Sequence, residues 1–172
     1  MSKIRNQDSL KEVSPRNIVN DVGPSEIDEQ TTARRGDRNV EYSTFGRHVA
    51  IDTWGVDFEK LNSAEFLQNH MVEAAEACGA TVLSVQAKQF EPQGATVLVL
   101  LSESHISIHT YPERGFAALD CYTCGETVDP ELAIQYMVNI LQPEKMYARK
   151  LIRGVGEMEV VESDVLKQKQ NA

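Results

Sequence analysis

Residues 95–113 read ATVLVLLSESHISIHTYPE, the most apolar run of the chain followed at once by its densest polar segment. The run ATVLVLL has the length and β-branching of a central strand. After it, polar and apolar residues alternate from position 105 to position 110, which predicts a second strand with two unlike faces. The apolar face holds Ile106 and Ile108, and the polar face holds His105, Ser107 and His109.

Strands are also expected on both sides of this stretch, at residues 48–52, 81–90, 116–124 and 147–153. In the second of these, Leu83, Val85 and Ala87 are predicted to share one face. Two amphipathic helices complete the pattern. The first is expected to begin at an Asn62 N-cap and to end at Gly79, and the second to begin at Asp129-Pro130. Their predicted apolar stripes are Leu67, Met71, Ala74, Ala75 and Cys78 in the first helix, and Ala133, Tyr136, Met137, Ile140 and Leu141 in the second.

Two helices and five or six strands predict an α+β domain. We expect a two-layer sandwich, with a mainly antiparallel sheet and both helices on one of its faces. The other face of such a sheet would be open to solvent and would need a partner. We therefore expect a homodimer that packs sheet on sheet.

Composition along the 172 residues indicates where this domain begins and ends. Residues 1–41 contain no aromatic residue and mix both signs of charge, which predicts a disordered tail. The domain is expected at 42–161, with a polar tail at 162–172. The net charge of −9 disfavours nucleic acid as a partner. No segment is apolar enough to span a membrane or to act as a secretory signal, so we expect a cytoplasmic protein with free thiols rather than disulfides.

The polar residues after the apolar run allow two interpretations. Strand alternation alone would explain an exposed polar face at His105 and His109, while polar groups at the end of a buried strand also suit a functional site. No metal site is expected, because histidines four positions apart in a strand lie too far apart to chelate easily. Cys121 and Cys124 form a CxxC, but in a strand they would point to opposite faces, which disfavours a redox pair.

Several separated motifs resemble the prokaryotic S-adenosylmethionine decarboxylases, a family of self-cleaving pyruvoyl enzymes, over roughly residues 42–161. These are FGRH (45–48), F-x-P-x-G (90–94), SESH-x-x-IHT-x-PE (102–113), D-x-Y-TCG (120–125) and RG-x-G (153–156). Two departures bear on the substrate. Ala95-Thr96 stands where small residues are expected, and Tyr111 stands where some members have tryptophan.

The resemblance implies that the chain cuts itself between Glu103 and Ser104, giving a β chain 1–103 and an α chain 104–172. The Ser104 hydroxyl would attack the Glu103 carbonyl to form an ester. β-Elimination and hydrolysis would then leave a pyruvoyl group that forms a Schiff base with the substrate. By resemblance His109 is the base in processing, and Cys124 is the general acid that reprotonates the product.

For the substrate, the resemblance implies S-adenosylmethionine, whose decarboxylated product supplies aminopropyl groups for spermidine. Phe90 and Tyr111 are candidates to contact the adenine and the sulfonium, and Glu113 is a candidate for the ribose hydroxyls. Two other readings stay open. The same machinery could act on arginine or ornithine, or the fold could serve a non-catalytic protein that binds small molecules.

Overall fold

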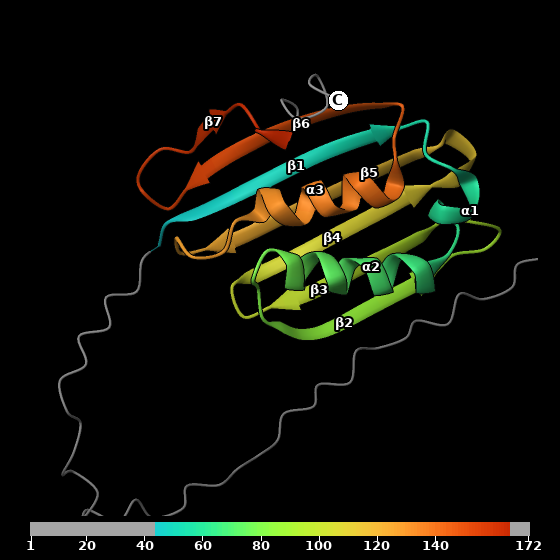
Figure 1. Ribbon diagram of the computed structural model, residues 1–172, viewed down its shortest axis with the longest axis horizontal. Coiled ribbons are helices and arrows are strands. Elements are labelled where there is room, and N and C mark those ends of the chain that lie inside the picture. Colours follow the sequence, from blue (N-terminus) through green and yellow to red (C-terminus); the bar gives the residue numbers. More distant parts are fainter. Residues whose placement is uncertain (1–43, 166–172) are drawn as a thin grey trace, which may run out of the picture. The chain divides into compact units, whose positions relative to one another are not determined.

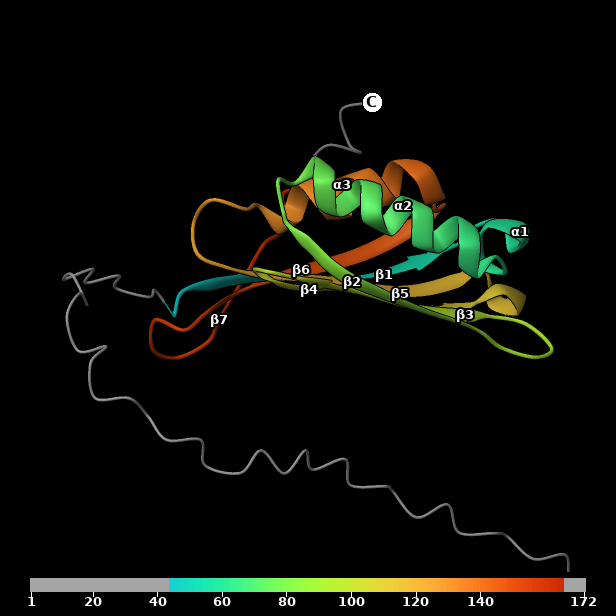
Figure 2. The same ribbon diagram turned by 90° about the horizontal axis from the view of Figure 1, so that it is seen from below.

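Residues 44–165 are described by a computed structural model, in which one antiparallel sheet carries all the helices on one face (Figures 1 and 2). The sheet has seven strands in the order β2-β3-β4-β5-β1-β6-β7. The strands are β1 (Gly46–Trp54), β2 (Val82–Gln89), β3 (Ala95–Leu101), β4 (Ser104–Tyr111), β5 (Phe116–Cys124), β6 (Lys145–Arg153) and β7 (Glu159–Val161). The helices are α1 (Phe58–Leu61), α2 (Ala64–Ala77) and α3 (Pro130–Leu141), with a 3₁₀ turn η1 at Pro112–Arg114.

This architecture confirms the predicted α+β sandwich. Helices α2 and α3 lie side by side over the sheet, and no helix or strand of residues 44–165 covers the opposite face, called the uncovered face below (Figure 2). The sequence did not predict the one-turn helix α1 or strand β7. The tail predicted at 1–41 and residues 166–172 lie outside the described part of the chain.

The core lies between the sheet and the helices. As the alternation predicts, Ile106 and Ile108 of β4 are fully buried beneath the helices. In β3 only one face of the apolar run is buried, with Val97 and Val99 in the core and Leu98 and Leu100 exposed. The predicted stripe of α2 is buried throughout. In α3, Ile134 and Val138 are buried in addition to the predicted Ala133, Met137 and Leu141, whereas Tyr136 and Ile140 are only partly covered.

Two local predictions are wrong. Helix α2 begins after Ser63, whose hydroxyl accepts a hydrogen bond from the Phe66 N–H, while Asn62 ends helix α1. The Asn62 side chain instead accepts a hydrogen bond from the Gly94 N–H at 2.9 Å. In β2, Leu83 does not share a face with Val85, because the pairing with β3 shifts between Val82 and Ser84. This bulge leaves Leu83 60% exposed.

The predicted polar tail also differs from the structure at its start. Ser163 and Val165 are buried, at 1% and 2% exposure. Ser163 Oγ and the Asp164 N–H both donate to the Glu131 carboxylate at the start of α3. The folded domain therefore extends to residue 165, because a charged group on the helix fixes this segment.

Within the described residues, no helix is long and apolar enough to cross a membrane.

Candidate active site

The turn between β3 and β4 holds the bond expected to be cut, and its backbone is unusual. Ser104 has a φ of 154°, and Gln142 is the only other non-glycine residue with positive φ among residues 44–165. L-residues rarely adopt such a conformation, which costs on the order of 1–3 kcal/mol. The Glu103–Ser104 linkage is therefore strained at the residue whose hydroxyl would attack.

Glu103, on the N-terminal side of this linkage, is held by one main-chain and one side-chain hydrogen bond. Its carbonyl oxygen accepts a hydrogen bond of 2.9 Å from the Cys124 N–H at the end of β5. Its carboxylate accepts one of 2.9 Å from the Thr81 N–H. The carbonyl that Ser104 would attack is thus fixed and polarised by a backbone donor.

The Ser104 hydroxyl lies 3.2 Å from Nδ1 of the adjacent His105. Neighbouring side chains of a regular strand point to opposite faces. The irregular φ of Ser104 accounts for this departure, since it turns the hydroxyl toward the ring of the next residue. The uncovered face of the sheet therefore presents a serine hydroxyl beside an imidazole.

The carboxylate of Asp120, on β5, accepts three hydrogen bonds on this uncovered face. Its Oδ2 lies 3.0 Å from Nε2 of His48 and 3.1 Å from Nε2 of His105, and its Oδ1 accepts from the Ser107 hydroxyl. Burial alone would raise the pKa of Asp120, but the hydrogen bonds from His48 and Ser107 and the nearby imidazoles lower it overall. Asp120 is therefore held as a carboxylate.

Arg153 closes the network beside His48. Its Nη1 lies 3.4 Å from Nδ1 of His48, and its guanidinium lies 4.4 Å from the centre of the Tyr122 ring. Because arginine can only donate, His48 accepts at Nδ1 and donates from Nε2 to Asp120. A permanent positive charge thus borders the network.

The network also contains three atoms that could bind a metal ion, one each from His48, His105 and Asp120. These atoms all lie within 4.8 Å of one another. The sequence did not predict this grouping, since only His105 and His109 were compared as ligands. Each of the three atoms already has a hydrogen-bond partner, and the guanidinium of Arg153 opposes a second cation nearby. We therefore interpret the group as a hydrogen-bonded network rather than a metal site.

The two cysteines of β5 differ as predicted. Cys121 is fully buried, and burial raises the pKa of its thiol well above the usual range. Cys124 is exposed at the end of the strand, next to the Glu103–Ser104 linkage through its main-chain hydrogen bond. Of these two thiols, Cys124 is therefore the one that solvent can reach. The third cysteine, Cys78, is buried on α2's stripe, and burial raises its pKa as well.

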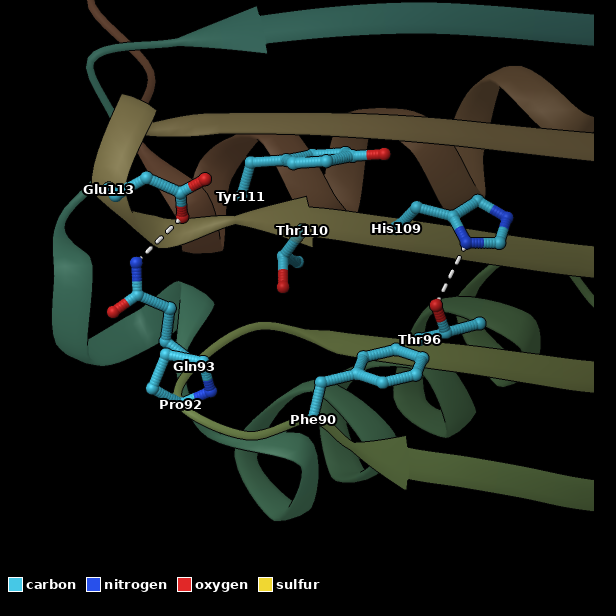
Figure 3. Close-up of a pocket in the computed structure, with 8 residues that line it drawn as sticks. All are labelled: Phe90, Pro92, Gln93, Thr96, His109, Thr110, Tyr111 and Glu113. Carbon is cyan, nitrogen blue, oxygen red and sulfur yellow. Dashed lines mark hydrogen bonds between the residues drawn. The ribbon is translucent and has the colours of Figure 1, made fainter. Parts of the chain in front are cut away.

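The three residues expected to bind substrate meet in one pocket of about 490 Å³ (Figure 3). Phe90 and Tyr111 are half exposed, and Glu113 accepts a hydrogen bond of 3.1 Å from Gln93 Nε2. His109 stands in the same pocket, with Nδ1 2.9 Å from the Thr96 hydroxyl. The pocket is lined by Phe90, Pro92, Gln93, Thr96, His109, Thr110, Tyr111 and Glu113.

The structure does not bring this pocket to the cleavage site within one chain. Ser104 begins β4, and His109 lies five positions further along the same strand. At about 3.3 Å per residue, their Cα atoms are roughly 17 Å apart. The predicted residues therefore fall into two groups: the cleavage cluster (Glu103, Ser104, Cys124 and the network around Asp120) and the Phe90 pocket, which contains His109, Tyr111 and Glu113.

The sequence missed His48, Asp120 and Arg153 as site residues. All three lie inside motifs that were noticed for other reasons, in FGRH, D-x-Y-TCG and RG-x-G. The strand order brings them together, because β1 lies between β5 and β6. Their proximity could be seen only once that order was known.

Comparisons with known proteins agree on one family. A family model described as S-adenosylmethionine decarboxylase matches residues 47–154. The S-adenosylmethionine decarboxylase proenzyme of Brevibacillus brevis is 78% identical over 126 residues, which cover 73% of this chain and 95% of that protein. The S-adenosylmethionine decarboxylase proenzyme 2 of Bacillus cereus ATCC 14579 is 62% identical over 119 residues, covering 69% of this chain and 97% of that protein.

A solved structure shows the same fold. The crystal structure of the adenosylmethionine decarboxylase from Aquifex aeolicus VF5 is similar with a TM-score of 0.63 and 38% sequence identity. The match covers 70% of this chain and 99% of that one.

Proposed function

Because the chain belongs to the S-adenosylmethionine decarboxylase family, we propose that it decarboxylates S-adenosylmethionine with a pyruvoyl group made from its own Ser104. Membership of this family makes the chain an enzyme, a decarboxylase of the lyase class. The proposed product is the aminopropyl donor for spermidine synthesis. The cytoplasmic location expected from the sequence stays a prediction.

The observation that carries this proposal is the geometry of the Glu103–Ser104 linkage. Ser104 is held at a φ of 154°, and the Glu103 carbonyl accepts the Cys124 N–H. Rearrangement of the amide to an ester releases this backbone constraint, and the N–H donor stabilises the charge that develops on the oxygen. The residues present thus fit a pyruvoyl precursor.

After cleavage, the two chains would stay together through the sheet. Strand β4 begins at Ser104 and pairs with β3 on one side and β5 on the other, so the new N-terminus remains anchored between them. The keto group formed there withdraws the electrons left behind when the substrate loses CO2. Cys124 lies beside this terminus and is exposed, which suits a thiol that returns a proton to the product.

The separation of the two groups leads to a site shared between copies. A residue roughly 17 Å from Ser104 cannot act on it within one chain. A second copy packed on the uncovered face, with strands reversed by a twofold axis near Ser107, would place its His109 opposite Ser104. Packed sheets lie about 10 Å apart, which side chains from both faces can span.

The uncovered face has the character of such an interface. Leu98, Leu100 and Tyr147 are between 43% and 54% exposed there, although each is apolar or aromatic. Leu98 and Leu100 lie on β3 and Tyr147 lies on β6, so exposed apolar groups stand on both sides of the polar network, which suits a surface that packs against a partner. We therefore propose a dimer of α/β heterodimers in which the Phe90 pocket of one copy completes the cleavage cluster of the other.

The Phe90 pocket supports a substrate with an aromatic base and a positive charge. Phe90 and Tyr111 offer ring faces for stacking and for attraction to a sulfonium, and Glu113 offers oxygens that can accept from hydroxyl groups. Arginine and ornithine lack the base and the ribose. The pair of aromatic rings therefore favours S-adenosylmethionine over these amino acids.

An intact mass spectrum under denaturing conditions tests the proposal. Active protein should give two chains, 1–103 and 104–172, the second beginning with a pyruvoyl group in place of Ser104. Release of CO2 from S-adenosylmethionine, arginine and ornithine is then compared. An active preparation that contains one unbroken chain would overturn the pyruvoyl mechanism, and turnover of arginine or ornithine alone would overturn the substrate.

A further inference from the structure

We propose that His105, held by Asp120, is the base that starts self-cleavage by taking the proton of the Ser104 hydroxyl. The proposal rests on the proposed cleavage at Ser104 and assigns its first step to a residue other than His109. The observation behind it is the chain of contacts from Ser104 Oγ to His105 Nδ1 at 3.2 Å, and from His105 Nε2 to Asp120 Oδ2 at 3.1 Å.

The hydrogen bonds fix which nitrogen of His105 is free to accept a proton. A carboxylate can only accept, so the Nε2 that faces Asp120 carries the hydrogen. In neutral His105 the lone pair is then on Nδ1, the atom that faces the Ser104 hydroxyl. The ring is thus held in the tautomer that a base for Ser104 needs.

The surroundings of Asp120 keep this arrangement in place. Ser107 and His48 donate to the same carboxylate, and Arg153 lies against the far nitrogen of His48. These contacts prevent Asp120 from turning away from His105. When His105 gains a proton, the charge forms beside a carboxylate already hydrogen-bonded to the ring, which stabilises it.

The first step balances in atoms and charge. The Ser104 Oγ–H proton passes to His105 Nδ1 while Oγ forms a bond to the Glu103 carbonyl carbon. The oxygen of that carbonyl is stabilised by the Cys124 N–H. The carbon–nitrogen bond then breaks, and the proton on Nδ1 moves to the nitrogen of Ser104. The result is an ester and a free amine, with His105 neutral again.

His109 is too far along β4 to take this proton in the same chain, as its separation from Ser104 shows. The later elimination needs a different base, because a proton must leave the Ser104 α-carbon after the ester has formed. The two histidines of the SESH-x-x-IH motif therefore act in successive steps. Loss of either blocks cleavage, but the two losses stop the reaction at different species.

The test follows cleavage of the full chain made by cell-free translation, for wild type, His105→Ala, His105→Asn and His109→Ala. Samples are taken with and without hydroxylamine, which cuts an ester but spares an amide. We expect His105→Ala to slow cleavage at least about 100-fold, with no fragment released by hydroxylamine. We expect His109→Ala to accumulate an ester that hydroxylamine cuts.

Added imidazole separates a missing base from a damaged fold. His105 is partly exposed in the single chain and lies at the site that must admit the substrate, so imidazole can reach the space left in His105→Ala and should speed cleavage severalfold. His105→Asn, which keeps more of the side-chain volume, should also stay slow. Thermal unfolding of all variants is compared with His70→Ala, whose ring lies on α2 and bonds to Glu73.

Asp120 is tested as a positioning residue through a double-variant cycle. Asp120→Asn should slow cleavage in the wild-type chain but add no further loss to His105→Ala, because it acts through that ring. Losses that multiply would show a role for Asp120 apart from His105 and overturn this part of the assignment.

The outcomes keep the two proposals apart. If the wild-type chain is never cut at Ser104, the proposed function fails. If it is cut and His105→Ala is cut at the same rate or accumulates an ester, the assignment of His105 fails while the pyruvoyl mechanism stands. Wild-type cleavage that a chelator abolishes would also overturn it, since the histidines would then bind a metal.

Discussion

The main-chain N–H of Cys124 donates a 2.9 Å hydrogen bond to the carbonyl oxygen of Glu103, which joins the end of β5 to the linkage before β4. In the proposed mechanism, one residue would thus offer its backbone to the cleavage step and its exposed side chain to the reaction that follows. Because the backbone donor does not depend on the side chain, substitution at Cys124 can separate the two stages.

Cys124→Ala should cleave itself at a normal rate but release CO2 from S-adenosylmethionine about 100-fold more slowly, since only the general acid is lost. The chains are weighed by mass spectrometry and CO2 release is measured on the same sample. Labelling the folded wild type with a maleimide should modify Cys124 and spare Cys121, whose thiol burial keeps protonated. Unchanged turnover in Cys124→Ala would remove this thiol from the mechanism.

Ser104→Ala and Ser104→Gly should both remain single chains, because neither has a hydroxyl to attack Glu103. Their stabilities should differ. Glycine adopts a φ of 154° without strain, so Ser104→Gly should be more stable than Ser104→Ala by on the order of 1 kcal/mol in the free energy of unfolding. Its unfolding temperature should be higher accordingly. Differential scanning calorimetry measures this. Equal stabilities would show that the linkage is not strained in the folded precursor.

Much of the fold could be read from residue patterns, because each strand near the centre of the sheet has one buried face. Alternation in β4 placed Ile106 and Ile108 in the core, and the bounds of β5 were predicted without error. Errors arose where a contact distant in sequence decides local structure. Ser63 caps α2 while Asn62 is bound by the 90–94 turn, and the bulge in β2 exposes Leu83.

The sequence named candidate site residues one by one but could not predict how they are arranged. The motifs named Ser104, His109 and Cys124, yet only strand order brings His48 beside Asp120, 72 positions away in the chain. The separation of His109 from Ser104 follows from strand geometry and could have been calculated beforehand. In the proposed dimer, a second copy packed on the uncovered sheet face would supply the missing histidine.

Mixed dimers test this shared site. Ser104→Ala and His109→Ala should each remain uncut alone. When the two are coexpressed with different tags, the His109→Ala chain should be cut in dimers where its partner supplies an intact His109. At equal expression about half of the His109→Ala chains should be cut, since random pairing makes half of the dimers mixed. Cleavage absent from the mixture, with mixed dimers present, would place His109 in its own chain's mechanism.

The aromatic side chains of the Phe90 pocket should set the affinity for substrate. Phe90→Ala should raise KM for S-adenosylmethionine about tenfold with little effect on cleavage, because a ring next to a sulfonium contributes on the order of 1–2 kcal/mol. Leu132→Ala serves as the control, since Leu132 is exposed on α3 away from the pocket. A Phe90→Ala enzyme with the wild-type KM would show that the substrate binds elsewhere.

Glu131 gives a prediction about stability that is independent of catalysis. Its carboxylate accepts from Lys150 Nζ at 2.6 Å, from Ser163 Oγ at 2.8 Å and from the Asp164 N–H at 2.6 Å, and it lies in the first turn of α3. Glu131→Gln leaves a largely buried Lys150 unpaired and should cost on the order of 2–3 kcal/mol in the free energy of unfolding. Glu76→Gln, on the exposed side of α2, is the matched control and should cost little.

The stability lost in Glu131→Gln should depend on pH, because the pKa of Glu131 is lower in the folded protein than in the unfolded chain. Burial alone would raise its pKa, but the hydrogen bonds from Lys150 and the 163–164 segment outweigh burial and lower it. A carboxyl group whose pKa is lower in the folded state stabilises the protein fully above its unfolded pKa, about 4.3, and loses that contribution as the pH falls through the folded value. Urea unfolding of wild type and Glu131→Gln should therefore differ most near neutral pH and converge below about pH 4. A difference in the free energy of unfolding between the two proteins that stays constant from pH 7 to pH 3 would mean that the packing of residue 131, and not its charge, fixes the 163–165 segment to α3.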